Sequence, residues 1–200
     1  RGLTRQLLTF SKAGEPVRRA HDLGPLVREA TSFVLSGSNV VADLQIAPDL
    51  WPCEVDEHQM AQVVDNLVIN ARQAMPSGGT IRVELANGRI PLGPVEGPSV
   101  RLSVEDQGPG IPRDLWSKVF DPFFTTKAGG TGLGLAMVHS IVRRHGGHVE
   151  VGSTRGGTGA RFDVFLPAMP GAIPQARSAE APARPEARMA GRGRVLVMDD

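Results

Sequence analysis

The spacing of apolar residues along the chain predicts an interleaved set of helices and strands. Apolar positions three and four residues apart predict four helices, at residues 1–13, 25–35, 56–75 and 132–144. Alternating apolar positions predict five strands, at residues 40–46, 81–85, 100–104, 149–151 and 162–166. Several neighbouring strands are typical of hairpins, so the predicted fold class is α+β. We expect a two-layer α/β sandwich, with a mixed, mostly antiparallel sheet covered on one face by helices.

The predicted helix that follows Asp56 carries the most information. Asp56 can cap its first turn, and Gln59 completes a start that resembles a capping box. One face is apolar and consists of Met60, Val63, Val64, Leu67 and Ala71. Asn66 and Asn70, four residues apart, share a face beside this stripe, although mid-helix asparagine is a mediocre helix former. They are either hydrogen-bonded, half-buried amides or a metal and phosphate site, because an amide oxygen suits Mg²⁺.

Two glycine-containing segments are candidates for ligand contacts. The segment 106–110, Asp-Gln-Gly-Pro-Gly, allows two interpretations. It is either a turn that begins at the aspartate, or a binding segment. In the second case the carboxylate contacts the exocyclic amine of a base, and the glycines let the backbone approach that flat base closely. The segment 129–135 runs from a long aperiodic loop into a helix. It is either a hinge or a phosphate cradle made of backbone N–H groups and a helix N-terminus. It matches neither the Walker A pattern nor the dinucleotide-binding glycine spacing.

Composition narrows the class of protein without naming an activity. Lys and Arg total 22 and Asp and Glu total 21, so no basic field favours nucleic acid or an anionic membrane as partner. The single cysteine, Cys53, cannot form an internal disulfide, which fits a reducing compartment. The sequence has no run of eighteen apolar residues and begins with Arg1 rather than Met. We therefore expect a fragment of a longer protein.

The order and spacing of these segments resemble the ATPase domains shared by histidine kinases, type II topoisomerases, heat-shock chaperones and mismatch-repair ATPases. The resemblance covers about residues 20–167. Its boxes occur in order, with the N box at 62–71, the G1 box at 106–111, the F box at 119–124, the G2 box at 130–135 and a final glycine-threonine element at 157–159. By this resemblance, the long loop between G1 and G2 would be an ATP lid.

The resemblance implies ATP and Mg²⁺ as cofactors. Asp106 would read the adenine amine and Asn70 would ligate Mg²⁺, while Lys127 is either a phosphate contact in the lid or a solvated lysine. Gln73 departs from the Lys found there in some kinases, which leaves its phosphate role open. The implied cofactor-binding residues are Asn66, Asn70, Asp106, Gly108, Gly110, Ile111, Phe120, Lys127, Gly130, Thr131, Gly132, Leu133, Gly134, Leu135 and Thr158.

Asn66 distinguishes between branches of this superfamily. Gyrase-like members that hydrolyse ATP carry a Glu one turn before the metal-binding Asn, where it activates water, and an amide cannot accept that proton. This difference, the F box and the sequence His-Gly-Gly at 145–147 resemble histidine kinases. Asn66 and Asn70 would then serve transfer of the γ-phosphate to a histidine outside the chain, in phosphorelay signalling. The alternatives are a gyrase-like ATP hydrolase and a non-catalytic nucleotide-binding scaffold.

The flanking segments complete the expected organisation. Residues 1–13 resemble the end of a dimerisation and phosphoacceptor hairpin, 14–167 the ATP-binding domain, 168–193 an Ala/Pro/Arg-rich linker, and 194–200 the start of a truncated receiver domain. His21 lies in a connector and is expected to be a solvated histidine. The expected partners are the hairpin of the same parent chain or its dimer mate and a receiver domain or response regulator, with no nucleic acid. The expected location is cytoplasmic, in a homodimeric parent.

Overall fold

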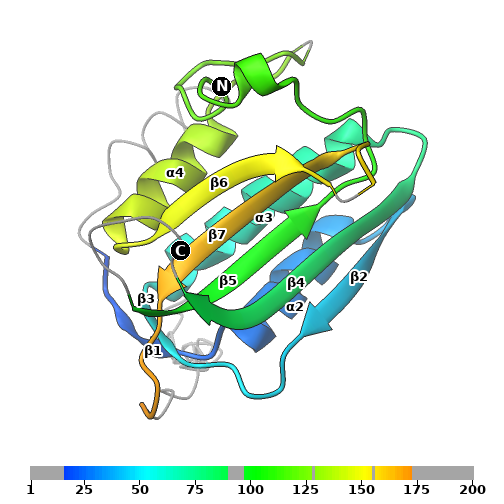
Figure 1. Cartoon of the computed structure of the whole chain (residues 1–200). Coiled ribbons are helices and arrows are strands. Elements are labelled where there is room, and N and C mark those ends of the chain that lie inside the picture. The colour runs from blue at the N-terminus through cyan, green and yellow to red at the C-terminus, as the bar shows by residue number, and fades with distance from the viewer. Residues whose placement is uncertain (1–15, 90–96, 128, 155, 173–200) are drawn as a thin grey trace, which may run out of the picture.

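A five-stranded sheet and three α-helices form two layers in the described part of the chain (Figure 1). The computed structural model describes residues 16–89, 97–127, 129–154 and 156–172. The order of strands across the sheet is β2 (Val40–Ile46), β4 (Gly79–Arg89), β5 (Pro98–Glu105), β7 (Ala160–Pro167) and β6 (His148–Ser153). β2 and β4 are parallel and the other neighbours are antiparallel, which confirms the predicted mixed sheet.

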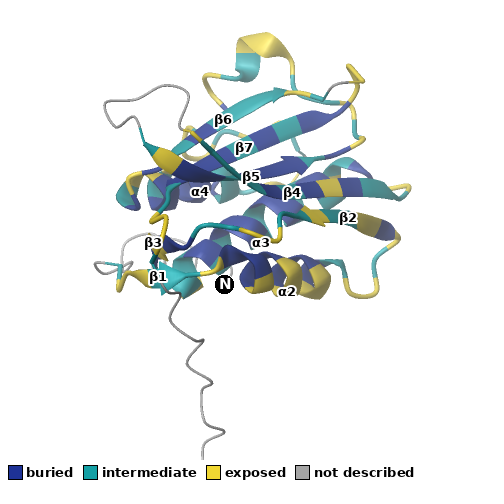
Figure 2. Ribbon diagram, turned by 60° about the horizontal axis from the view of Figure 1, so that its bottom comes forward, coloured by how far each residue is buried: buried dark blue, intermediate teal, exposed yellow. Residues whose placement is uncertain are grey.

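The helices α2 (Leu23–Leu35), α3 (Glu57–Ala74) and α4 (Gly134–Arg144) cover one face of the sheet. Figure 2 shows the buried residues gathered between the two layers. The largest fully buried side chains are Leu67, Ile81, Leu85, Ile141 and Leu166. Each such burial contributes about 1.5–3 kcal/mol. α3 packs against both α2 and α4, so its polar edge has a fixed place beside the loops at one end of the sheet. None of the described helices is long and apolar enough to span a bilayer.

The open face of the sheet carries charged side chains, which explains the alternation in the strands. Arg101 on β5 forms ion pairs with Glu84 on β4 and, at 3.2 Å, with Asp163 on β7. Arg161 on β7 lies 2.7 Å from Asp163. These pairs lie on the sheet face opposite the helices, so the sheet has one apolar and one polar side.

A second, two-stranded sheet was not predicted from the sequence. β1 (Arg19–His21) pairs antiparallel with β3 (Cys53–Val55), and His21 lies opposite Cys53. Three residues are too few to show an alternating pattern, so this pairing has no sequence signal. His21 therefore lies in a strand rather than in a loop. Burial raises the pKa of the Cys53 thiol to about 12, which keeps it protonated and unreactive.

Two helices begin at different residues from those predicted. α2 begins at Leu23 rather than Pro25, because the Asp22 side chain accepts a hydrogen bond from the Gly24 N–H at 2.8 Å and caps the first turn. α4 begins at Gly134 rather than Gly132, because Gly132 has φ +66° and lies in the lid. The predicted long loop at 106–132 also contains a 3₁₀ turn at Arg113–Leu115.

His145, directly after α4, links that helix to the start of α3. Asp56 caps α3 as predicted, since its Oδ1 accepts from the Gln59 N–H at 3.1 Å. In a capping box the Gln59 side chain would accept a hydrogen bond from the Asp56 N–H. Here the Asp56 N–H donates instead to His145 Nε2 at 3.1 Å. His145 Nδ1 lies 2.8 Å from the Ile141 carbonyl oxygen. Nδ1 therefore carries the hydrogen, and the buried ring is neutral.

We expect the domain to lose stability as the pH falls through about 6.5, the ordinary pKa of histidine. Burial, aided by the charge of Arg18, lowers the pKa of His145. The unfolded chain therefore takes up a proton at a pH where the folded chain does not, so stability is complete above 6.5 and declines below it. Urea unfolding from pH 8 to pH 5 should show a free energy of unfolding that is constant above about pH 6.5 and falls below it.

Two variants separate this histidine from the others. His145→Gln should show a smaller decline with pH, and His58→Gln, at an exposed position on α3, should keep the wild-type decline. A decline in His145→Gln equal to that of the wild type would contradict the assignment.

Candidate functional site

Asn66 and Asn70 project from the edge of α3 that borders α4 and the lid. The Asn66 Nδ2 donates to the Gln62 carbonyl oxygen at 2.8 Å, so the nitrogen of this amide has a hydrogen-bond partner within its own helix. The Asn66 oxygen faces the start of α4, because a Cβ added at Gly134 would lie 3.1 Å from Asn66 Oδ1. Asn66 is thus both a hydrogen-bonded amide and a neighbour of the glycine segment, so neither explanation of the asparagine pair excludes the other.

Lys127 of the lid reaches Asn70 across 57 residues of sequence. Its Nζ donates to Asn70 Oδ1, to the Asn70 carbonyl oxygen at 3.1 Å and to Gln73 Oε1 at 3.2 Å. Burial lowers the pKa of Lys127, and the nearby Asp106 carboxylate acts in the opposite direction. The amide oxygen of Asn70 therefore faces the lid, in a position where it attracts a cation.

Asp106, directly after β5, is buried, with 4% of its surface exposed. Its Oδ1 accepts from the Gly108 N–H at 2.9 Å and from the Ala160 N–H at 3.1 Å. Burial raises the pKa of Asp106, while the two backbone hydrogen bonds and Lys127 oppose that change. In the described part of the chain both bonds engage Oδ1, so Oδ2 remains to accept a hydrogen bond from a ligand.

Backbone packing around Asp106 requires glycine at position 159. Gly159 has φ +98°, and a Cβ there would lie 1.9 Å from the Asp106 carbonyl oxygen. Gly110 lies against Gly159, because a Cβ added at Gly110 would lie 3.0 Å from the Gly159 carbonyl oxygen. The final glycine-threonine element and the G1 box therefore meet at Asp106. Thr158 itself is exposed, and its carbonyl oxygen accepts a hydrogen bond from the Thr154 hydroxyl.

A contact between the F box and the G2 box closes the second half of the lid. Phe123 is the one described non-glycine residue with positive φ, at +68°, and its N–H donates to the Gly132 carbonyl oxygen at 2.9 Å. A Cβ at Gly132 would lie 2.3 Å from the Phe123 carbonyl carbon. Such a conformation costs roughly 1–3 kcal/mol and persists only where neighbours enforce it. The part of the lid between Phe123 and Gly132 therefore begins and ends at one fixed point.

Aromatic packing anchors the lid to the sandwich. The Phe120 ring centroid lies 5.6 Å from that of His139 on α4 and 6.4 Å from that of Phe162 on β7. Burial, with the charges of Arg143 and His148, lowers the pKa of His139. Phe120, expected from the sequence to contact the cofactor, lies in an aromatic cluster here.

The other residues of the expected set lie along the same end of the sandwich. Leu133 is buried, whereas Leu135 and Ile111 are partly buried against the core. No side chain caps the start of α4 in the described structure, which leaves its first N–H groups to a ligand. Of the remaining members, Gly130 and Thr131 lie just before α4, and Gly134 is its first residue.

Sequence reasoning missed two contributors to the site. The Ala160 N–H, which holds Asp106, has no signal because any residue except proline supplies it. Trp116 donates from Nε1 to the Ile111 carbonyl oxygen at 3.0 Å, and the Arg113 guanidinium lies 5.4 Å from its ring centroid. This contact shapes the loop after G1, and a lone Trp in an aperiodic segment does not reveal it.

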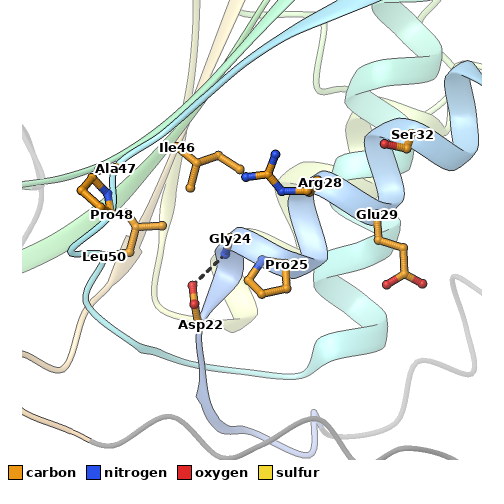
Figure 3. A pocket seen from close by; sticks show the side chains of 10 residues that line it. All are labelled: Asp22, Gly24, Pro25, Arg28, Glu29, Ser32, Ile46, Ala47, Pro48 and Leu50. Carbon is orange, nitrogen blue, oxygen red and sulfur yellow. Dashed lines mark hydrogen bonds between the residues drawn. The ribbon is translucent and has the colours of Figure 1, made fainter.

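A separate hollow lies at the other end of the sheet (Figure 3). It has a volume of about 520 Å³ and is lined by Asp22, Gly24, Pro25, Arg28, Glu29, Ser32, Ile46, Ala47, Pro48 and Leu50. The strand register gives the position of the hollow relative to Asp106. Ile46, which lines the hollow, pairs with Leu85 on β4. Asp106 follows Glu105, and Glu105 pairs with Arg82, nearer the start of β4. The hollow is therefore distinct from the site around Asp106.

The donor set around Asp106 and Asn70 fits a nucleotide with a magnesium ion. A buried carboxylate oxygen suits an amine, a glycine-lined helix start suits phosphates, and a lysine adds positive charge. The described residues hold no group of three His, Cys, Asp or Glu that could bind a metal. A single amide oxygen is enough for Mg²⁺ when phosphates and waters complete its octahedral shell.

Comparison with known proteins gives a consistent set of relatives. Residues 55–170 match the family described as histidine kinase-, DNA gyrase B-, and HSP90-like ATPase. The chain is 35% identical to Sensor kinase CckA of Brucella abortus, over 99% of the chain and 22% of that protein. It is 39% identical to Sensor histidine kinase ZraS of Escherichia coli O157:H7, over 81% of the chain and 34% of that protein. The chain thus spans about a fifth to a third of these relatives.

Solved structures agree with the sequence relatives. Full-length ShkA in complex with AMPPNP matches 87% of the chain and 37% of its own, with a TM-score of 0.72 and 26% identity. The catalytic domain of histidine kinase ThkA, in a nucleotide-free form, matches 76% of the chain and 95% of its own, with a TM-score of 0.65 and 30% identity.

Proposed function

The chain belongs to the histidine kinase-, DNA gyrase B- and HSP90-like ATPases, as the ATPase domain of a sensor histidine kinase, and from this premise we propose that it binds ATP with Mg²⁺ and passes the γ-phosphate to a histidine on a helical hairpin. The observation that carries the proposal is that Lys127 bonds to Asn70 and lies near Asp106, while Asn66, one turn before Asn70, faces the glycine-lined start of α4.

Asp106 supplies the recognition of adenine in this proposal. Its Oδ1 is held by two backbone N–H groups, so the carboxylate plane has a fixed direction. The other oxygen accepts a hydrogen bond from the exocyclic amine of the base. A buried carboxylate that is already oriented loses little conformational entropy on binding, which supports affinity as well as selectivity.

The phosphates would lie between α3 and the start of α4. Asn70 would hold Mg²⁺, which supplies positive charge to the phosphate oxygens when it is bound. Lys127 would contact the phosphates from the lid, and the uncapped N–H groups after Gly132 would receive their oxygens. These residues bind and orient the nucleotide, which is most of the protein's task in phosphoryl transfer.

Asn66 supports transfer to a histidine rather than to water. Its side chain is a neutral amide, and its Nδ2 is already bonded to the Gln62 carbonyl oxygen. No proton can be taken from a water at this position, so the gyrase-like hydrolase is not favoured. An imidazole needs no such base inside this domain, because its own nitrogen attacks.

Residues 1–13 and 173–200 of the proposed assembly lie outside the described part of the chain. We assign 1–13 to the phosphoacceptor hairpin, 14–167 to the catalytic domain, 168–193 to a linker and 194–200 to the start of a receiver domain. The similarity to Sensor kinase CckA, which covers 99% of the chain, supports flanks shared with a sensor kinase. The hairpin and the receiver would be the partners, in a cytoplasmic part of a homodimeric parent.

A labelling experiment tests this function. Incubated with Mg²⁺ and γ-labelled ATP, the chain should bind nucleotide and retain no label, because the acceptor histidine is not part of it. A longer piece that includes the proposed hairpin should retain acid-labile label on histidine. Label retained on the 200-residue chain would contradict the proposal, as would steady phosphate release that collapses in Asn66→Ala.

A further inference from the structure

Lys127 joins the lid to the last two turns of α3 through three oxygen atoms. Two belong to Asn70, its side-chain and carbonyl oxygens, and the third is Gln73 Oε1 at 3.2 Å. An ammonium group has three hydrogens, so these acceptors use its full capacity. The lysine is half-buried, and its hydrogen bonds offset the cost of removing the ammonium from water.

This contact and a magnesium ion exclude each other at Asn70. Mg²⁺ takes its oxygen ligands at about 2.0–2.1 Å in nearly ideal octahedral geometry. The same Oδ1 already accepts from the Lys127 ammonium, and two cations on one oxygen would repel each other strongly. Metal binding at Asn70 therefore requires Lys127 to leave that oxygen.

Gln73 supplies the third hydrogen-bond acceptor that keeps Lys127 against Asn70. It lies three residues after Asn70 on α3, so both side chains face the lid from one side of the helix. Gln73 is exposed and contributes a neutral amide oxygen. A neutral acceptor near solvent contributes one modest hydrogen bond rather than an ion pair, so the lysine can be exchanged for a metal.

We propose that Gln73 is a positioning residue that holds Lys127 on Asn70, so that Mg²⁺ must displace the lysine and thereby frees the lid to engage the phosphates. The inference rests on the proposed function, because it assumes that Asn70 receives the metal. It makes binding of the metal and movement of the lid a single competitive event. In the described structure Gln73 contacts Lys127, and the proposed role is exerted through that lysine.

A magnesium titration of nucleotide binding tests the competition. The affinity of the 200-residue chain for AMPPNP, a non-hydrolysable ATP analogue, is measured by calorimetry over a range of Mg²⁺ concentrations. Gln73→Ala should lower the Mg²⁺ concentration at half-maximal enhancement by about two- to tenfold, the size of one hydrogen bond. Hydrogen exchange at residues 123–127 should also become faster. Gln45→Ala, on the edge strand, is the matched control and should change neither quantity.

A double-mutant cycle with Lys127→Met separates positioning from a general effect on α3. Lys127→Met should lower the required Mg²⁺ concentration at least as far, and Gln73→Ala should have no further effect in that background. Equal shifts in both backgrounds, or an unshifted titration in Gln73→Ala, would overturn the inference while leaving the proposed function intact. A wild-type chain that binds no AMPPNP at any Mg²⁺ concentration would overturn both.

Discussion

Replacing Asn70 by alanine is expected to weaken Mg²⁺-dependent ATP binding by about 100-fold, as loss of a metal ligand does when few others exist. The Asn70 side-chain oxygen faces the lid and already accepts a hydrogen bond from the Lys127 ammonium. The variant also removes an acceptor of Lys127, so the lid loses part of its attachment to α3. Calorimetry with AMPPNP, in Mg²⁺ and in EDTA, measures the two contributions separately.

The metal contribution is recognised by its dependence on Mg²⁺. Asn70→Ala should bind AMPPNP equally in Mg²⁺ and in EDTA, whereas the wild type should bind far more tightly in Mg²⁺. Asn39→Ala removes an exposed asparagine that donates to the Pro76 carbonyl oxygen and serves as the control. If Asn70→Ala kept the wild-type response to Mg²⁺, Asn70 would not be the metal ligand.

Asp106→Asn is expected to reduce the affinity for ATP by about 100-fold, because a buried polar contact is replaced by a conflict. The amide oxygen can still accept from the Gly108 and Ala160 N–H groups, but its NH₂ group then faces the adenine amine, donor against donor. The opposite orientation sets the NH₂ group against the two backbone donors. Either arrangement therefore loses hydrogen bonds, with the adenine amine in the first case and with the backbone in the second.

Stability and a surface control distinguish recognition from misfolding. The variant should keep a thermal unfolding midpoint within a few degrees of the wild type, since the first orientation satisfies the backbone donors. Asp43→Asn, at a partly exposed position on the edge strand β2, should bind ATP like the wild type. Wild-type affinity in Asp106→Asn would show that this carboxylate does not read the base.

Long, strongly periodic segments made the fold predictable. The stripe on α3 and the alternation in β2, β4 and β7 gave the elements and their layer, because burial on one face dictates both patterns. β1 and β3 are too short to carry such a period, and their pairing depends on contacts between residues 19–21 and 53–55. The start of α2 was missed because its cap, Asp22, precedes the proline that suggested a first turn.

The site was predictable as a set of residues but not as an arrangement. Asn70, Asp106 and Lys127 belong to boxes with fixed order, so their presence could be read from the sequence. The bond between Lys127 and Asn70 depends on how a long aperiodic lid folds back, and no local pattern records that. The same holds for His145, whose bond to the Asp56 N–H spans 89 residues.

The hydrogen bond between Phe123 and Gly132 allows the segment between them to vary in length. Both ends are fixed at one point, where the Phe123 N–H meets the Gly132 carbonyl oxygen and no side chain fits at position 132. Insertions or deletions between these residues leave this hydrogen bond and the start of α4 in place. Each doubling of loop length adds only about 0.6 kcal/mol to the entropic cost of closing the loop. The length of this segment can therefore change while the rest of the proposed nucleotide site stays constant.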